Sequence, residues 1–298
     1  MATSMPLVSA EVETINVEEK EYTVKGYTLK QDLSNKKFTS EEIAHFLIDR
    51  FYICPACNKI QRGWALYEEK VDGIILRKFF LKCKHVFTTL TGLQVVDIEY
   101  KEMLVMWVRV ETINVQLIQR SDSILFPTMQ MLQISFTGDP GISSTTLAYF
   151  RPTGITVTSG STYNNYLTFG AGAAAGDASN GIVIGTSNAA NSPTAYALGS
   201  QIANGTSSGQ MQYGAMNVNA LATSGNTVSF QANRTFTNNS GASITVAEVG
   251  IYMLVSANSA GNVIVPSFAF ARDVLASPVT VANTTPITVY YTIQLTIS

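Results

Sequence analysis

Three cysteines and one histidine in the first third of the chain have the residue types and the spacing of a metal site. Cys54 and Cys57 form a Cys-x-x-Cys pair, and 25 residues separate it from a second pair, Cys83 and His85. A Cys-x-x-Cys turn presents two thiolates to one metal ion, and a second pair from a β-hairpin completes a tetrahedral Cys3His site. This set uses all three cysteines and one of the two histidines. The sequence therefore predicts a metal site at these four residues.

The segment around these residues, 52–90, resembles a zinc ribbon. It departs from the usual pattern at its second pair, which is Cys-x-His and one residue shorter than Cys-x-x-Cys. The resemblance implies one structural zinc ion per chain. The alternative is three buried free thiols with a histidine at the surface. A redox role for the Cys-x-x-Cys pair is disfavoured, because no thioredoxin-like βαβ pattern surrounds it.

Zinc ribbons often bind nucleic acid, and the charges of this segment bear on that role. Between Cys54 and His85 there are seven basic and three acidic residues, a net charge of +4, with Phe79 and Phe80 among them. Such a surface could contact phosphates and stack on a base. A solvated charged face on a small domain is the simpler interpretation. Nucleic acid is therefore not an expected partner.

Motifs for catalysis are weak. The Gly-x-Ser-x-Gly match at 205–209 lacks the strand, the helix and the downstream histidine of a nucleophile elbow. Glu248 and Asp273 could form a carboxylate pair for glycoside hydrolysis. Charges this scarce in a β domain are more often buried in ion pairs, so we expect them to pair with Arg234 and Arg272. We do not expect the protein to be an enzyme.

The distribution of charge divides the chain in two. Only 13% of the 298 residues are charged, and the net charge is −2. Of the 19 basic and 21 acidic residues, eight follow residue 120, and the last lysine is Lys101. This break predicts a charged α/β domain at 1–103, which contains the zinc-ribbon-like segment. It also predicts a β domain at 104–298 that is rich in Gly, Ser, Thr and Asn.

Periodicity predicts a mainly β fold. Thr39 and Glu42 form a capping-box pattern before a helix expected over 40–52, which includes the second histidine, His45. Alternating apolar and polar residues between polar turns indicate strands in both parts. For the second part they favour a β-sandwich or jelly roll. The expected strands are 21–29, 74–81, 85–90, 104–118, 124–136, 227–236, 243–255, 263–271 and 287–297.

The stretch 158–226 has low complexity and a single charge, Asp177. A disordered linker is one interpretation of such a composition. Its aromatic and aliphatic residues favour ordered, loop-rich β structure instead. They include Tyr163, Tyr166, Phe169, Tyr196 and Leu198.

The C-terminal half contains a series of short sequences in a recognisable order. They are Gly181-Ile-Val-Ile-Gly-Thr, Thr194-Ala-Tyr-Ala-Leu, the run from Arg234 to Tyr252, Ala271-Arg-Asp-Val-Leu and Ile287-Thr-Val-Tyr-Tyr-Thr-Ile. In this order they resemble a β-sandwich module of virion structural proteins from tailed phages and related prokaryotic viruses, over residues 160–298. The resemblance implies a particle component, such as a capsid decoration protein, a head fibre or a tail-associated subunit.

Composition is consistent with that role. A surface without lysine and with few charges suits a subunit that packs against its own copies, because lysine is costly to immobilise and is depleted in interfaces. We expect a homo-oligomer that docks on other virion proteins through its charged N-terminal half. The sequence shows no membrane segment and no secretory signal. We therefore expect synthesis in the host cytoplasm, a place in the virion and no membrane partner. The alternatives are a cell-surface adhesin or filament subunit, and a zinc-ribbon nucleic-acid-binding protein.

Overall fold

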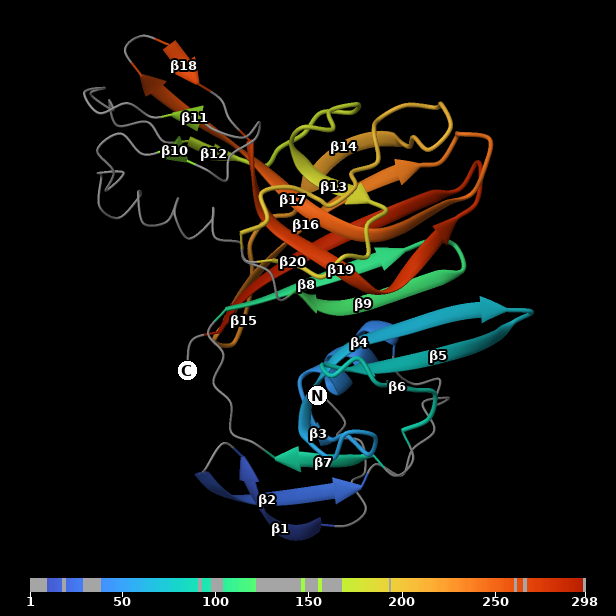
Figure 1. The fold of residues 1–298 in the computed structure, drawn as a ribbon, viewed down its shortest axis with the longest axis vertical. Coiled ribbons are helices and arrows are strands. Elements are labelled where there is room, and N and C mark those ends of the chain that lie inside the picture. The colour runs from blue at the N-terminus through green and yellow to red at the C-terminus, as the bar shows by residue number, and fades with distance from the viewer. Residues whose placement is uncertain are drawn as a thin grey trace.

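The protein is mainly β, as the sequence predicts (Figure 1). Its computed structural model describes residues 10–17, 20–28, 39–90, 93–97, 104–121, 146–147, 155–156, 168–192, 194–259, 262–264 and 267–296. The named strands within these ranges pair in antiparallel fashion, and the one helix there is α1 (Ser40–Ile48). No helix in these ranges is long and apolar enough to cross a membrane.

A large twisted sheet runs through most of the described chain. The order along the main path is β1 (Ala10–Val17), β2 (Lys20–Thr28), β7 (Gln94–Asp97), β3 (Phe51–Ile53), β4 (Ile60–Val71), β9 (Val115–Ser121), β8 (Leu104–Glu111), β20 (Pro286–Thr296), β16 (Thr227–Thr237) and β14 (Gln212–Val218). Off this path, β5 (Ile74–Leu81) pairs with β4, and β6 (Val86–Phe87) pairs with β5. In the same way β15 (Ala222–Ser224) pairs with β16.

A second sheet packs on the C-terminal half of the first. Its central strand is β17 (Ile244–Ser259), which pairs with β12 (Thr168–Gly170), β13 (Gly181–Gly185), β18 (Asn262–Ile264) and β19 (Ser267–Val281). Buried side chains of both sheets form one apolar core, including Val249 and Leu275 from the second sheet and Val108 and Tyr291 from the first. The two sheets therefore form a β-sandwich. A separate two-stranded sheet is formed by β10 (Thr146–Leu147) and β11 (Ile155–Thr156).

A smaller core surrounds α1 in the N-terminal half. Ile43 and Leu47 of the helix are buried together with Tyr52, Phe79 and Trp107. The predicted capping box is confirmed, because the Glu42 amide donates to the Thr39 hydroxyl and the Thr39 amide donates to the Glu42 carboxylate. The cap thus fixes where the helix begins, and its buried side chains pack it against the sheet.

The predicted helix end at residue 52 is wrong. The helix stops at Ile48, and residues 51–53 form β3 between β4 and β7. The physical reason is the close approach of β4, where a side chain on Gly63 would lie 2.3 Å from the Leu47 carbonyl oxygen. The Gly63 amide donates to the Arg50 carbonyl, so the chain leaves the helix and enters the sheet. The predicted strand at 85–90 is also too long, since β6 covers only Val86–Phe87.

The hairpin of β8 and β9 links the two compositional halves. The expected strand at 104–118 is in fact two strands, of which β9 pairs with β4 and β8 pairs with β20. The sheet is therefore continuous from the charged part to the charge-poor part. The domain boundary between residues 103 and 104 stays a prediction. The expected strand at 124–136 lies outside the described residues.

Candidate metal centre

The four predicted ligands lie on two neighbouring hairpin turns. Cys54 and Cys57 belong to the turn between β3 and β4, and Cys83 and His85 belong to the turn between β5 and β6. Because β3 and β5 both pair with β4, the sheet brings the two turns to the same place. Residues far apart in the sequence are thus juxtaposed by strand pairing alone.

Backbone hydrogen bonds fix the shape of each turn. In the first turn the Asn58 amide donates to the Cys54 carbonyl over 2.7 Å, and the Cys54 amide donates to the Lys59 carbonyl over 3.0 Å. In the second turn the Lys84 amide donates to the Leu81 carbonyl over 2.7 Å. Asn58 and Lys84 both adopt positive φ angles, 52° and 66°, which tighten the chain around the thiols.

The four ligand atoms fit one tetrahedral metal ion. They lie within 4.8 Å of one another. The sulfur of Cys83 is 3.6 Å from the sulfur of Cys54 and 3.2 Å from Nδ1 of His85, and the Cys54 sulfur is 3.4 Å from the same nitrogen. Metal–sulfur bonds of about 2.3 Å in a tetrahedral shell place two sulfurs about 3.8 Å apart. The cluster could therefore bind a metal ion, and its Cys-x-His pair is not too short to do so.

Electrostatics differ between the thiols of the two turns. Burial acts to raise the pKa of the Cys54 thiol, but hydrogen bonds from the backbone of Cys57 and Ala56 outweigh it, so the pKa is lowered. Burial and the neighbouring thiols Cys54 and Cys57 raise the pKa of Cys83 to about 11. A bound divalent cation would hold the thiols as thiolates and offset the repulsion between their negative charges.

The environment of the cluster indicates a structural site. Cys54 is fully buried in the core around α1, and Cys57 and Cys83 pack against that core. Four protein ligands complete a tetrahedral shell and leave no position for a substrate. A metal here would connect both hairpin turns to the core of the N-terminal half.

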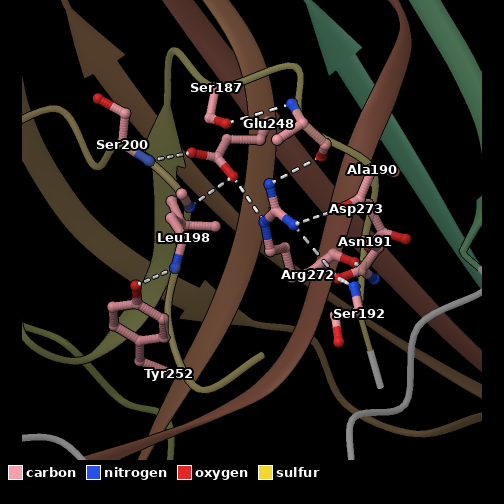
Figure 2. A network of polar contacts seen from close by, with 12 residues as sticks. Ser187, Ala190, Asn191, Ser192, Leu198, Ser200, Glu248, Tyr252, Arg272 and Asp273 are labelled. Carbon is pink, nitrogen blue, oxygen red and sulfur yellow. Dashed lines mark hydrogen bonds and ion pairs between the residues drawn. The ribbon is translucent and has the colours of Figure 1, made fainter. Parts of the chain in front are cut away.

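Glu248 and Arg272 form the buried ion pair that the sequence predicts (Figure 2). The Arg272 Nε donates to the Glu248 carboxylate over 2.7 Å, and neither side chain is more than 5% exposed. The same carboxylate accepts the amides of Gly199 and Ser200 over 2.9 and 2.7 Å. Gly185 leaves room for it, since a side chain there would lie 2.5 Å from a carboxylate oxygen.

This network fixes part of the low-complexity stretch onto the outer face of the second sheet. Arg272 Nη2 donates to the Ala189 carbonyl, and the Leu198 amide donates to the Tyr252 hydroxyl over 2.8 Å (Figure 2). Leu198 itself is buried in the main apolar core. The described part of 158–226 has the predicted ordered, loop-rich structure, whereas Tyr163 and Tyr166 lie outside the described residues.

The expectation that Arg234 pairs with a carboxylate is wrong. Its guanidinium is fully buried, and all five of its N–H groups donate to backbone carbonyls at 2.6–3.0 Å. The rings of Tyr213 and Phe236 lie 4.8 and 5.8 Å from the guanidinium carbon. Carbonyl dipoles and aromatic faces therefore replace the expected counter-ion. The five acceptors are the carbonyls of Ala174, Asp177, Asn180, Ile182 and Gly214.

Glu248 and Asp273 do not form a glycosidase-like pair. In the β17–β19 ladder Asp273 lies opposite Val249, so the two carboxylates project from opposite faces of the sheet. Asp273 points inward and accepts hydrogen bonds from the hydroxyls of Ser121 and Tyr291, both at 2.9 Å. Burial, followed by the Asp273 charge, raises the pKa of Tyr291 well above its ordinary value.

Side chains that the sequence did not single out bind the outer edge of β19. The Gln119 amide group accepts the Ala276 N–H over 2.9 Å and donates to the Val274 carbonyl over 3.2 Å. Asn191 donates to the Arg272 carbonyl over 2.7 Å, and Pro278 has no N–H to offer. These groups blunt the edge against pairing with another strand. Only Pro278 could have signalled this from sequence, because neutral amides carry no distinctive pattern.

Comparison with known proteins yields no relative. No protein-family model matches the chain, and neither a curated protein nor a solved structure matches it. The function must therefore be argued from the residues themselves.

Proposed function

We propose that the protein is a non-catalytic structural component of a viral particle, which self-associates and docks on other virion proteins. The observation that carries this proposal is a cluster of exposed aliphatic side chains, here called the hairpin patch. It consists of Val71, Ile74, Ile75, Leu76 and Ile113, which are 43–78% exposed.

The hairpin patch lies on two adjacent turns. The first four residues surround the β4–β5 turn, and Ile113 lies in the β8–β9 turn. The Lys70 amide donates to the Asn114 carbonyl over 2.9 Å and ties the turns together. Figure 1 shows both turns at the same side of the molecule. A cluster of exposed aliphatic side chains of this kind favours a protein interface.

The exposure pattern says what kind of interface this is. Successive side chains of a strand point to opposite faces, yet Ile74, Ile75 and Leu76 are exposed in a row. Both faces of the β4–β5 hairpin are therefore uncovered at its end. Such a projection suits insertion between neighbouring subunits. The β4–β5 hairpin belongs to the charged N-terminal half, which is the half expected to dock. The lysine-free sandwich would supply the surface for self-packing.

We further propose that the metal is zinc, held by Cys54, Cys57, Cys83 and His85. Thiolate and imidazole donors in a closed tetrahedral set favour zinc over harder cations. The ion would stiffen the base of the projecting β4–β5 hairpin, because the cluster lies at the turns that flank β4 and β5. Elemental analysis of the purified chain should give about one equivalent of zinc. Another metal, or none in protein purified without chelator, would contradict this assignment.

Association of the full chain tests the particle role. Sedimentation velocity over a wide concentration range should show self-association, and mixing with purified particles of the source virus that lack the protein should give binding. Ile74→Ser combined with Ile113→Ser should weaken particle binding by at least tenfold. The matched control is Val218→Ser combined with Leu221→Ser, which removes two similarly exposed aliphatic side chains outside the hairpin patch and far in sequence from the metal ligands. A chain that stays monomeric at every concentration and binds no particle would refute the proposal.

A further inference from the structure

A cavity of about 480 Å³ lies between the metal-bearing turn and the sandwich. Its wall on one side comes from β4, β5 and the β5–β6 turn, and on the other from β9, β19 and the loop at 188–191. It is therefore built from both compositional halves of the chain. Sites for small ligands are often found where two such units meet.

Three cations and one anion line this cavity. The cations are Lys82, Lys84 and Arg120, and the anion is Asp273. The oxygens of Asp273 accept the hydroxyls of Ser121 and Tyr291, which turn that carboxylate toward the sandwich core. Arg120 also lies 4.0 Å from Asp49, outside the lining. Among the lining residues, cations therefore outnumber anions by three to one.

The apolar part of the lining is aromatic and aliphatic. Trp64 and Phe80 contribute rings, and Leu275 and Pro278 contribute aliphatic surface from β19. The Lys82 ammonium lies 6.0 Å from the centre of the Trp64 ring, so the two side chains are neighbours in the lining. The Trp64 Nε1–H is buried without a hydrogen-bond partner in the structure.

We infer that the cavity is a binding site for a small organic phosphate monoester. Such a group carries about −1.5 to −2 charges at neutral pH and three acceptor oxygens, which matches the excess of positive charge in the lining. The rings and aliphatic side chains would accommodate the organic body. The inference concerns a small ligand and does not rest on the particle role.

The competing explanation is that Lys82 and Lys84 only balance the charge of the metal cluster. A Cys3His site with a divalent cation carries one net negative charge. However, the thiol of Cys83 faces the cluster, whereas the two flanking lysines line the cavity, and Lys82 lies against Trp64. The metal site would instead position this pair of cations. The ligand site is therefore expected to depend on an intact turn.

Calorimetric titration of the full, metal-loaded chain with phenyl phosphate tests the inference. We expect saturable binding, with inorganic phosphate binding more weakly and phenol not binding. Lys82→Gln and Lys84→Gln should each weaken phenyl phosphate binding roughly tenfold. Lys59→Gln should leave it unchanged, because Lys59 is an exposed lysine of the other metal-bearing turn and does not line the cavity. Metal content measured for each variant separates loss of the cation from loss of the metal site.

The fluorescence of Trp64 locates the ligand. The chain has two tryptophans, and the second, Trp107, is buried in the core around α1. Phenyl phosphate should change the emission of the wild type, and Trp64→Phe should abolish most of that change. Absence of saturable binding, equal binding of phenol, or unchanged affinity in both lysine variants would each overturn the proposal. Inorganic phosphate binding as tightly as phenyl phosphate would overturn the assignment of an organic body.

Discussion

The two halves of the molecule fix their loops by different chemistry. In the N-terminal half, four side chains from two turns converge on one point and could share a metal ion. In the sandwich, single charged side chains reach out to backbone groups of the loops that cover them, as Arg234 and Glu248 do. The first device needs a bound ion, whereas the second is complete within the chain.

This difference reflects what each half has available. The N-terminal turns are short and lie next to each other, so a compact cluster can connect them. The sandwich loops are long, and only a few of their side chains, such as Leu198 and Ile202, are buried in the core, so burial alone does not fix their backbone. Their exposed backbone groups need partners instead. One buried arginine supplies five donors, which is the most that any side chain offers.

Removal of a metal ligand is the most severe test of this difference between the two halves. His85→Gln should lose the metal and destabilise the N-terminal half by about 5 kcal/mol or more, because binding free energy is folding free energy in such sites. His45→Gln is the matched control. His45 lies on the helix, its ring contacts the ring of Trp107, and it is not one of the four ligands. Elemental analysis and urea unfolding followed by tryptophan emission measure both effects. Equal stability of the two variants would show that the cluster contributes nothing to folding.

The second test removes the arginine at the centre of the carbonyl cluster. Arg234→Leu leaves five backbone carbonyls without their donor and should cost about 3–5 kcal/mol. Arg50→Met is a suitable control, because Arg50 lies over the ring of Phe46 at the surface of the helix. The free energy of unfolding from urea titrations is the measurement. Metal content should stay at the wild-type level in Arg234→Leu, because the metal site in the N-terminal half does not depend on the carbonyl cluster. A loss of metal in this variant would show that the halves do not fold independently.

The strands and the candidate ligands could be predicted from the sequence, because strands depend on side-chain periodicity and metal sites depend on ligand type. The strands near the C-terminus and the inward positions of Ile287, Val289 and Tyr291 agree with the alternation. The four candidate ligands are brought together as predicted, because cysteine and histidine have few other reasons to occur at this spacing. The Glu248–Arg272 pair was predictable from the scarcity of charge.

The remaining features depend on contacts between distant segments. The central strand β4 was missed because Arg62, Glu68 and Lys70 interrupt its apolar pattern, although both of its edges are paired. The carbonyl partners of Arg234 were unpredictable, because a backbone acceptor has no sequence signature. The helix end at Ile48 depends on the packing of Gly63 from another strand. Local pattern contains no information about such tertiary contacts.

The smallest expected effect is the contribution of one residue of the sandwich, Tyr213, to the pH dependence of stability. Burial raises the pKa of Tyr213 to about 12, from about 10 in an unfolded chain. The folded state therefore holds this proton more tightly, and the stability it contributes is complete below pH 10 and disappears as the pH rises toward 12. The maximum effect is about 2–3 kcal/mol.

Tyr213→Phe isolates this contribution. At neutral pH the variant should be less stable by about 1 kcal/mol, since the hydroxyl donates to the Ile202 carbonyl over 2.6 Å. Between pH 10 and 12 the difference should shrink or reverse, because only the wild type must retain a neutral buried phenol. Tyr196→Phe, at an exposed position, controls for the loss of a hydroxyl. A constant difference across this range of pH would mean that Tyr213 is accessible to solvent, and the loops at 171–185 and 202–213 would then be less firmly held than the carbonyl cluster requires.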